Sequence, residues 1–112
     1  MTAESDAMAA RIRPVLASKR LELMEKKMFG GIGFMHRGNM LVGTTAKGAL
    51  LVRIDPAKAD EALARPGAFQ MHMGPRPMTG FIGVDEGGIP DEPALNGWID
   101  YATKFVKTLP PK

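Results

Sequence analysis

The sequence predicts an α+β fold of two layers, with an antiparallel sheet of about five strands and helices packed mainly on one face of it. Three observations lead to this fold class. Apolar residues recur at helical spacing near both ends of the chain, period-two alternation around glycine-containing turns runs through the middle, and an Asp-Pro pair begins a short central helix. The predicted order of elements is α-β-β-β-α-β-β-α.

The first helix is expected over residues 5–20. Its apolar face consists of four residues at helical spacing: Met8, Ile12, Val15 and Leu16. Ser5 or Asp6 can cap its first turn. Pro14 lies in its interior, where a proline removes one backbone hydrogen bond and clashes with the preceding turn. We therefore expect a kink at Pro14, or two short helical pieces.

The next segments predict an antiparallel meander, counted as three strands in the predicted order. Residues 21–29 alternate imperfectly, which is typical of a strand with a bulge. Residues 32–45 read as two strands around a turn at Arg37-Gly38-Asn39, because Gly and Asn tolerate the positive φ of tight hairpins. A further turn at Lys47-Gly48 leads into a strand that ends near Asp55.

The second half begins with a helix start, because Asp55 can cap free amides and Pro56 suits the first helical position. Residues 68–73 predict a strand whose Phe69, Met71 and Met73 face inward, and residues 78–86 predict its hairpin partner. The last helix follows Asp91 and Glu92. Its apolar stripe contains Leu95, Trp98, Ile99, Ala102, Phe105, Val106 and Leu109. Gly97, within this helix, is expected to mark close contact with the sheet.

Length and composition indicate one domain over residues 1–112, with a core of about residues 8–108. The chain lacks cysteine, so disulfides, thiolate catalysis and cysteine-bound metals are excluded. It also lacks a signal-peptide pattern and an apolar run of the roughly 20 residues that span a bilayer. We expect a cytoplasmic protein without membrane contact. The net charge of +3 divides into +5 for residues 1–53 and −2 for residues 54–112, and a solvated basic face explains this division best.

The glycine-rich stretch "KKMFGGIGFMHRGNM" raises the question of a phosphate site. Gly33 and Gly38 have the glycine spacing of a P-loop, but Asn39 and Met40 stand where Lys and Ser or Thr are required. A dinucleotide-binding motif opens a helix, whereas "GGIG" opens a predicted strand. We therefore interpret the glycines as a turn or bulge where backbones pass closely.

The remaining chemistry-bearing residues indicate no enzyme. His36 and His72 are too few for a metal centre, and Ser5 and Ser18 lack a nucleophile-elbow motif. Two carboxylate pairs, at residues 85–86 and 91–92, are explained by helix capping and a solvated loop. We assign no catalytic, cofactor-binding or metal-binding residue. The nine methionines are interpreted as core filling, with an adaptable binding surface as the alternative.

The segment from Lys26 to Asp55 resembles the N-terminal domain of the TfoX/Sxy regulators of natural competence. The matching positions are Lys27, Met28, Phe29, Gly30, Gly31, Gly33, Gly38, Met40 and Asp55. Lys27 stands where the family usually has Arg. The resemblance covers roughly residues 8–108. It implies an α/β domain of helix, three strands, helix, two strands and helix, and a regulatory role beside a cyclic-AMP receptor protein. The two-domain regulators carry a further helical domain, and we expect a single-domain member here.

Three functional hypotheses follow. The first is a non-enzymatic module that binds protein partners, including transcription machinery, with a homodimer left open. The alternative is direct binding of nucleic acid or a phosphate ligand through the basic half and the glycine amides. The third is a minor enzyme or small-molecule binder, which requires a concave pocket with convergent polar groups, and the sequence offers no set of residues for it. The residues expected to contact a partner or an anion are Lys26, Lys27, Phe29, Gly30, Gly31, Gly33 and Arg37.

Overall fold

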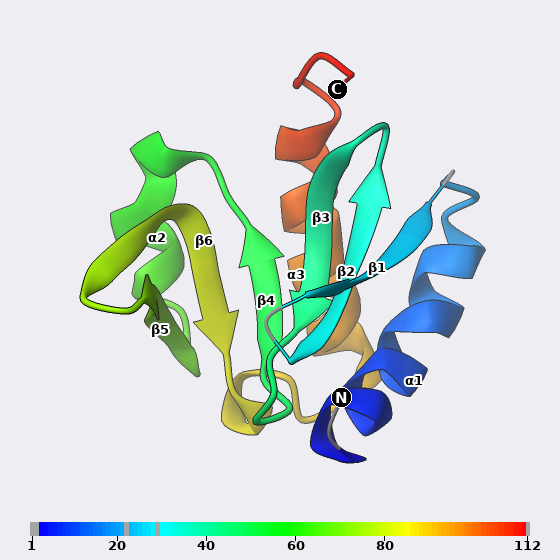
Figure 1. Cartoon of the computed structure of the whole chain (residues 1–112), viewed down its shortest axis with the longest axis horizontal. Helices are drawn as coiled ribbons and strands as arrows, with labels where there is room; N and C mark the ends of the chain where they lie inside the picture. Colours follow the sequence, from blue (N-terminus) through cyan, green and yellow to red (C-terminus); the bar gives the residue numbers. More distant parts are fainter. Residues whose placement is uncertain (1–2, 22, 29, 112) are drawn as a thin grey trace.

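The computed structural model describes residues 3–21, 23–28 and 30–111. Its helices and strands are α1 (Ala3–Ser18), β1 (Met24–Met28), β2 (Gly31–His36), β3 (Asn39–Thr44), β4 (Leu50–Arg53), the 3₁₀ turn η1 (Pro56–Lys58), α2 (Ala59–Leu63), β5 (Ala68–Met73), β6 (Arg76–Val84), the 3₁₀ turn η2 (Glu86–Gly88) and α3 (Glu92–Val106). The strands form one antiparallel sheet in the order β1-β2-β3-β4-β6-β5 (Figure 1). The α+β prediction is confirmed, with six strands in this sheet rather than about five, because four strands precede α2 where the predicted order has three.

The helices share one face of the sheet. Helix α3 contacts β3 and β4, α1 contacts β2 and β3, and α2 contacts β5 and β6; Figure 1 shows α3 behind β3 and β4. The main core lies between these layers. Its members from the helices include Ile12, Leu16, Ala62, Leu95, Trp98 and Ile99, and those from the strands include Phe34, Val42, Leu50, Val52, Ile82 and Val84. Because the helices of the described chain all pack on one face of the sheet, none of them covers the other face.

Helix α1 differs from its prediction. It runs without interruption through Pro14, so two separate pieces are wrong. Pro14 is exposed, and so is Ala10, whose carbonyl loses the usual bond from residue 14; water can therefore satisfy that group. The helix begins at Ala3, so Ser5 is not its cap. Ser5 is buried, and its Oγ lies 2.6 Å from Thr44 Oγ1.

The hairpin of β2 and β3 turns where the sequence predicts. Arg37 and Gly38 have φ angles of 54° and 85°, and two successive positive φ values are the requirement of a type I′ turn. The predicted bulge in residues 21–29 is wrong, because β1 pairs with β2 in one unbroken register. One register shift falls instead between β2 and β3 and leaves Leu41 as an extra residue, and another falls between β5 and β6.

Local helix signals are confirmed. Asp55 Oδ1 accepts a hydrogen bond from the Ala57 amide, and Pro56 follows as the first residue of η1. Asp91 Oδ1 accepts one from the Ala94 amide at the start of α3. Gly97 does not mark close contact with the sheet, since an added Cβ there would meet no atom within 4 Å.

Candidate functional site

The two lysines of the glycine-rich stretch lie on opposite sides of β1. Lys26 pairs with Gly33 and Lys27 with Ile32. Ile32 belongs to the main core on the helix side, so Lys26 lies on the uncovered side of the sheet. Both lysines are exposed. The strand therefore directs the two ammonium groups apart instead of converging them on one anion.

The glycines nearby are required by backbone geometry. Gly30, with φ of 76°, turns the chain between β1 and β2. A Cβ on Gly31 would lie 2.0 Å from the Thr44 carbonyl oxygen, and a Cβ on Gly33 would lie 2.9 Å from Met28 Sδ. These are positions of close approach, as the sequence indicates. Phe29 lies outside the described residues.

Arg37 is not brought together with these residues. It lies in the turn at the far end of β2 from Gly30, which is roughly 20 Å away at the rise of an extended strand. The structure thus brings Gly30, Gly31 and Gly33 close to Lys26 and Lys27 along one hairpin, but separates Arg37 from them.

The basic residues of α1 are engaged within the molecule. The Arg13 guanidinium donates to both carboxylate oxygens of Glu25 at 2.8 and 2.9 Å, and these bonds hold the pKa of Glu25 below its ordinary value. Arg11 donates to the Ile89 carbonyl at 2.9 Å. Lys19 pairs with Asp100. These contacts connect α1 to β1 and to the α3 region, which gives the basic side chains structural partners.

The uncovered face of the sheet is rich in methionine. We define the methionine face as the side chains of Met24, Met28, Met35, Met40, Met71, Met78, Leu51 and Phe69. The cross-strand register places Gly33, Gly43, Leu51, Gly83 and Phe69 in one row on this side. Among the described side chains of the main core, Met8 is the one methionine. Core filling is therefore the wrong interpretation for most of these methionines.

Glycines form the floor of this face and let side chains lie flat on the sheet. Met40 Cε would lie 2.6 Å from a Cβ on Gly43, and the Phe69 ring 2.3 Å from a Cβ on Gly83. This packing buries Met40 and Leu51, which are 7% and 3% exposed, apart from the main core. Phe69 itself is 38% exposed. The predicted inward orientation of Phe69 is wrong because its side of β5 is the one without helices.

A groove of about 320 Å³ lies at one end of the methionine face. It is lined by Thr44, Thr45, Leu51, Met71, His72, Gly74 and Met78. Apolar side chains from β4, β5 and β6 line it, and the threonine hydroxyls are engaged within the fold: Thr44 Oγ1 accepts a hydrogen bond from the Ile32 amide and Thr45 Oγ1 accepts one from the Ala49 amide. Such a lining suits an apolar side chain of a partner better than a charged ligand.

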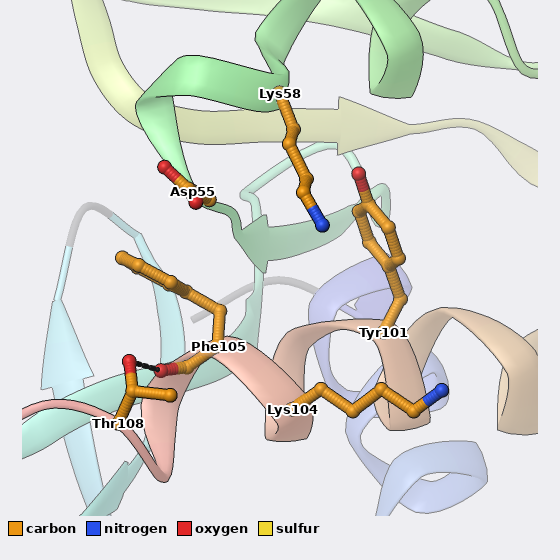
Figure 2. Close-up of a pocket in the computed structure, with 6 residues that line it drawn as sticks. All are labelled: Asp55, Lys58, Tyr101, Lys104, Phe105 and Thr108. Atoms are coloured by element: carbon orange, nitrogen blue, oxygen red, sulfur yellow. Dashed lines mark hydrogen bonds between the residues drawn. The ribbon is translucent and has the colours of Figure 1, made fainter.

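A second cavity, of about 340 Å³, lies on the helix side between η1 and the C-terminal half of α3. It is lined by Asp55, Lys58, Tyr101, Lys104, Phe105 and Thr108 (Figure 2). Three of these residues lie on α3 and Thr108 follows its end, and the four have the spacing of one helix face. This face borders the apolar stripe that packs on the sheet, and its Tyr101 and Phe105 side chains lie at the edge of the main core, facing η1.

Tyr101 is held firmly in this cavity but has an unpaired oxygen. Its ring meets the Trp98 ring edge to face at 5.9 Å between centroids, and the Arg65 guanidinium lies 5.1 Å from its centroid. The hydroxyl oxygen is buried and has no hydrogen-bond partner among the described residues. Burial raises the pKa of the Tyr101 hydroxyl, which stays protonated and able to donate.

A comparison with models of protein families finds a match that covers the strands and the last helix. The family model of the TfoX N-terminal domain matches residues 16–106, which is most of the chain and runs from the end of α1 to the end of α3. The chain belongs to the TfoX N-terminal domain family. No curated protein and no solved structure shows significant similarity to the chain.

The matched region of this TfoX N-terminal domain contains the whole methionine face and most of the lining of the second cavity. Within residues 3–21, 23–28 and 30–111, no group of three or more metal-ligating side chains occurs. No helix in the described part of the chain is long and apolar enough to cross a membrane. The resemblance found in the sequence is confirmed at the level of the family.

One spacing pattern in the sequence marks the α3 side of the second cavity, although it was not among the features that predicted a site. Tyr101, Lys104, Phe105 and Thr108 recur at i, i+3, i+4 and i+7, next to the apolar stripe. That pattern indicates a second functional or packing face on the same helix. The partners Asp55 and Lys58 carry no such signal, because they are more than 40 residues away along the chain.

Proposed function

We propose that this chain is a non-enzymatic regulatory domain that binds a protein partner through its methionine face. Membership in the TfoX N-terminal domain family favours a role in gene regulation, including the regulation of competence genes. The observation that carries the proposal is the exposure of Met24 and Phe69. They are 72% and 38% exposed and are the exposed large hydrophobic residues of the described chain.

The physical chemistry of the face supports this choice. Both exposed residues lie on the side of the sheet that no helix covers, at β1 and β5, its two edge strands. Methionine has an unbranched, polarisable side chain that adapts to varied apolar shapes. Lys26, also on this side of β1, adds a positive charge at the border. The partner surface that fits is an apolar ridge with an acidic flank.

Site-specific crosslinking tests the proposal. A photoreactive amino acid is placed at Met24 or Phe69, with Lys107 at the end of α3 as the matched exposed control. We expect crosslinks in the native cell to one regulatory protein from both positions on the methionine face and none to that protein from Lys107. The variant Phe69→Ser should keep its circular dichroism spectrum and lose the captured partner. Equal patterns from all three positions, or crosslinks to a second copy alone, would contradict the proposal.

Direct binding of nucleic acid makes a different prediction. Affinity for duplex DNA would then fall steeply with salt concentration, and the double variant Lys26→Ala, Lys27→Ala would weaken it. Because the two lysines lie on opposite sides of β1, we expect the double variant to leave the affinity for DNA unchanged. A steep salt dependence that disappears in the double variant would favour the alternative over the protein partner.

A further inference from the structure

The second cavity has walls of different chemical character. Figure 2 shows Lys58 extending from η1 toward α3 and Tyr101 rising from the helix beside it, whereas the Lys104 side chain runs along α3 with its ammonium group directed away from Lys58. Asp55 and Phe105 lie on the other side of the view, and Thr108 is below them. The cavity therefore has one side formed by the Lys58 ammonium group, the Tyr101 phenol and the stem of Lys104, and another side with an aromatic ring.

The cationic side is not neutralised within the protein. Neither Lys58 nor Lys104 forms an ion pair within 4 Å among the described residues. Asp55 is the one carboxylate of the lining, and its Oδ1 already accepts the Ala57 amide. The lining residues therefore carry an excess of positive charge. An anion beside the Lys58 ammonium group, with the flexible Lys104 side chain turned toward it, would gain charge-assisted hydrogen bonds, the stronger class of hydrogen bond in proteins.

The Tyr101 hydroxyl supplies a fixed donor beside these amines. Burial of a hydroxyl that lacks a hydrogen-bond partner costs desolvation free energy that no hydrogen bond compensates. An acceptor oxygen brought by a ligand would supply that hydrogen bond. Trp98 and Arg65 hold the ring on two sides, so little side-chain freedom is lost when the hydroxyl binds. The donor is therefore organised before any ligand arrives.

The opposite wall suits an apolar group. The Phe105 ring lines the cavity, and the Arg53 guanidinium lies 5.8 Å from its centroid and 4.9 Å from that of Phe81. The Thr108 hydroxyl donates to the Phe105 carbonyl at 2.6 Å, so it is occupied by the helix end. The volume of about 340 Å³ is at the lower end of the range of small-ligand sites, about 300–1,000 Å³.

We propose that this cavity binds a small organic anion, whose acidic oxygens are held by Lys58, Lys104 and the Tyr101 hydroxyl and whose apolar part packs on Phe105. The chemistry is that of a carboxylate or phosphate ester on a compact, ring-sized body. This site is independent of the methionine face, because it lies on the helix side of the sheet.

Nuclear magnetic resonance titration tests the site with defined probes. Phenyl phosphate and benzoate supply the two acid groups on a ring, benzyl alcohol is the neutral counterpart, and inorganic phosphate lacks the apolar body. We expect saturable amide shifts at Tyr101 and Phe105 with both ring anions, weaker binding of inorganic phosphate and none of benzyl alcohol. Shifts that do not saturate, or equal affinity for the neutral probe, would overturn the proposal.

Variants locate the binding on the lining residues. Lys58→Met and Lys104→Met keep the apolar stem and remove the charge, and Lys107→Met is the matched control outside the cavity. Loss of one charge-assisted hydrogen bond predicts about tenfold weaker binding of phenyl phosphate for each lining variant. The control should bind like the parent. Unchanged affinity in both lining variants, or equal weakening in all three, would overturn the assignment.

The variant Tyr101→Phe separates binding from folding. It removes an oxygen that has no partner among the described residues, so the unliganded domain should unfold at the same temperature as the parent or a higher one. Its affinity for phenyl phosphate should nevertheless fall. A lower unfolding temperature with unchanged affinity would show that the hydroxyl serves the fold and would remove it from the site.

Discussion

Alanine at Gly31 should disrupt the domain far more than alanine at Gly33, although the two glycines are two residues apart on β2. A Cβ on Gly31 would lie 2.0 Å from the Thr44 carbonyl oxygen and 2.8 Å from the carbonyl carbon. Both are backbone atoms of the neighbouring strand, so relief requires the strands to separate. A Cβ on Gly33 would meet Met28 Sδ at 2.9 Å and Met40 Cε at 3.3 Å. Both are ends of flexible side chains that can rotate away.

The size of the difference follows from these contacts. Overpacking costs about 1–3 kcal/mol. Separation of the strands would also weaken the 2.9 Å hydrogen bond from the Ile32 amide to Thr44 Oγ1, which contributes about 1 kcal/mol. Replacing a strand glycine by alanine reduces the conformational entropy lost on folding, which raises the free energy of unfolding by about 0.5–1 kcal/mol. Gly31→Ala should therefore lower the free energy of unfolding by about 2–3 kcal/mol, whereas Gly33→Ala should stay within about 1 kcal/mol of the parent.

Urea unfolding measures both values on a common scale. Trp98, the one tryptophan, is 2% exposed, so its fluorescence reports loss of the main core. We expect a clearly lower midpoint for Gly31→Ala and an unchanged slope for both variants. Equal midpoints for the two variants, or a larger loss for Gly33→Ala, would refute the assignment of these glycines to backbone approach and side-chain packing.

Three further changes test local features of the fold. Asp91→Ala removes the cap on the Ala94 amide and should cost about 1 kcal/mol of unfolding free energy, measured as a lower melting temperature. Arg37→Asn places a residue that favours positive φ at the turn position with φ of 54° and should raise the unfolding free energy by up to about 1 kcal/mol; a loss would contradict the turn type. Glu25→Gln removes the exposed pair with Arg13 and should cost under about 1 kcal/mol at neutral pH. Because the folded pKa of Glu25 is lowered, that stabilisation exists above the ordinary glutamate pKa of about 4.3 and is lost as pH falls through the lowered value, so the two melting temperatures should converge in acid.

Much of the fold could be predicted because its signals are local. The Asp55-Pro56 start depends on a side chain and the amides of the next turn, and the Arg37-Gly38 turn depends on two φ angles. The bulge could not be placed, because a register shift depends on which residues of β2 and β3 pair.

The candidate sites depend on information that a single segment does not contain. Alternation showed that Phe69 and Met71 share one side of β5, but parity alone does not say which side the helices cover. Lys26 and Lys27 are adjacent in sequence but lie on opposite sides of the sheet, because successive side chains of a strand alternate between its two faces. The cavity around Tyr101 requires η1 to dock on α3.

The sequence by itself determined the α+β class, the family, the Asp55 and Asp91 caps and the Arg37-Gly38 turn, because each rests on periodicity or on the conformational preference of a few neighbouring residues. Only the tertiary structure decided which face of the sheet the helices cover. That choice placed six methionines and Phe69, which were expected in the core, on the side of the sheet that no described helix covers. It also joined Lys58 to Tyr101 and Lys104, since residues distant in the chain meet only where packed layers bring them together.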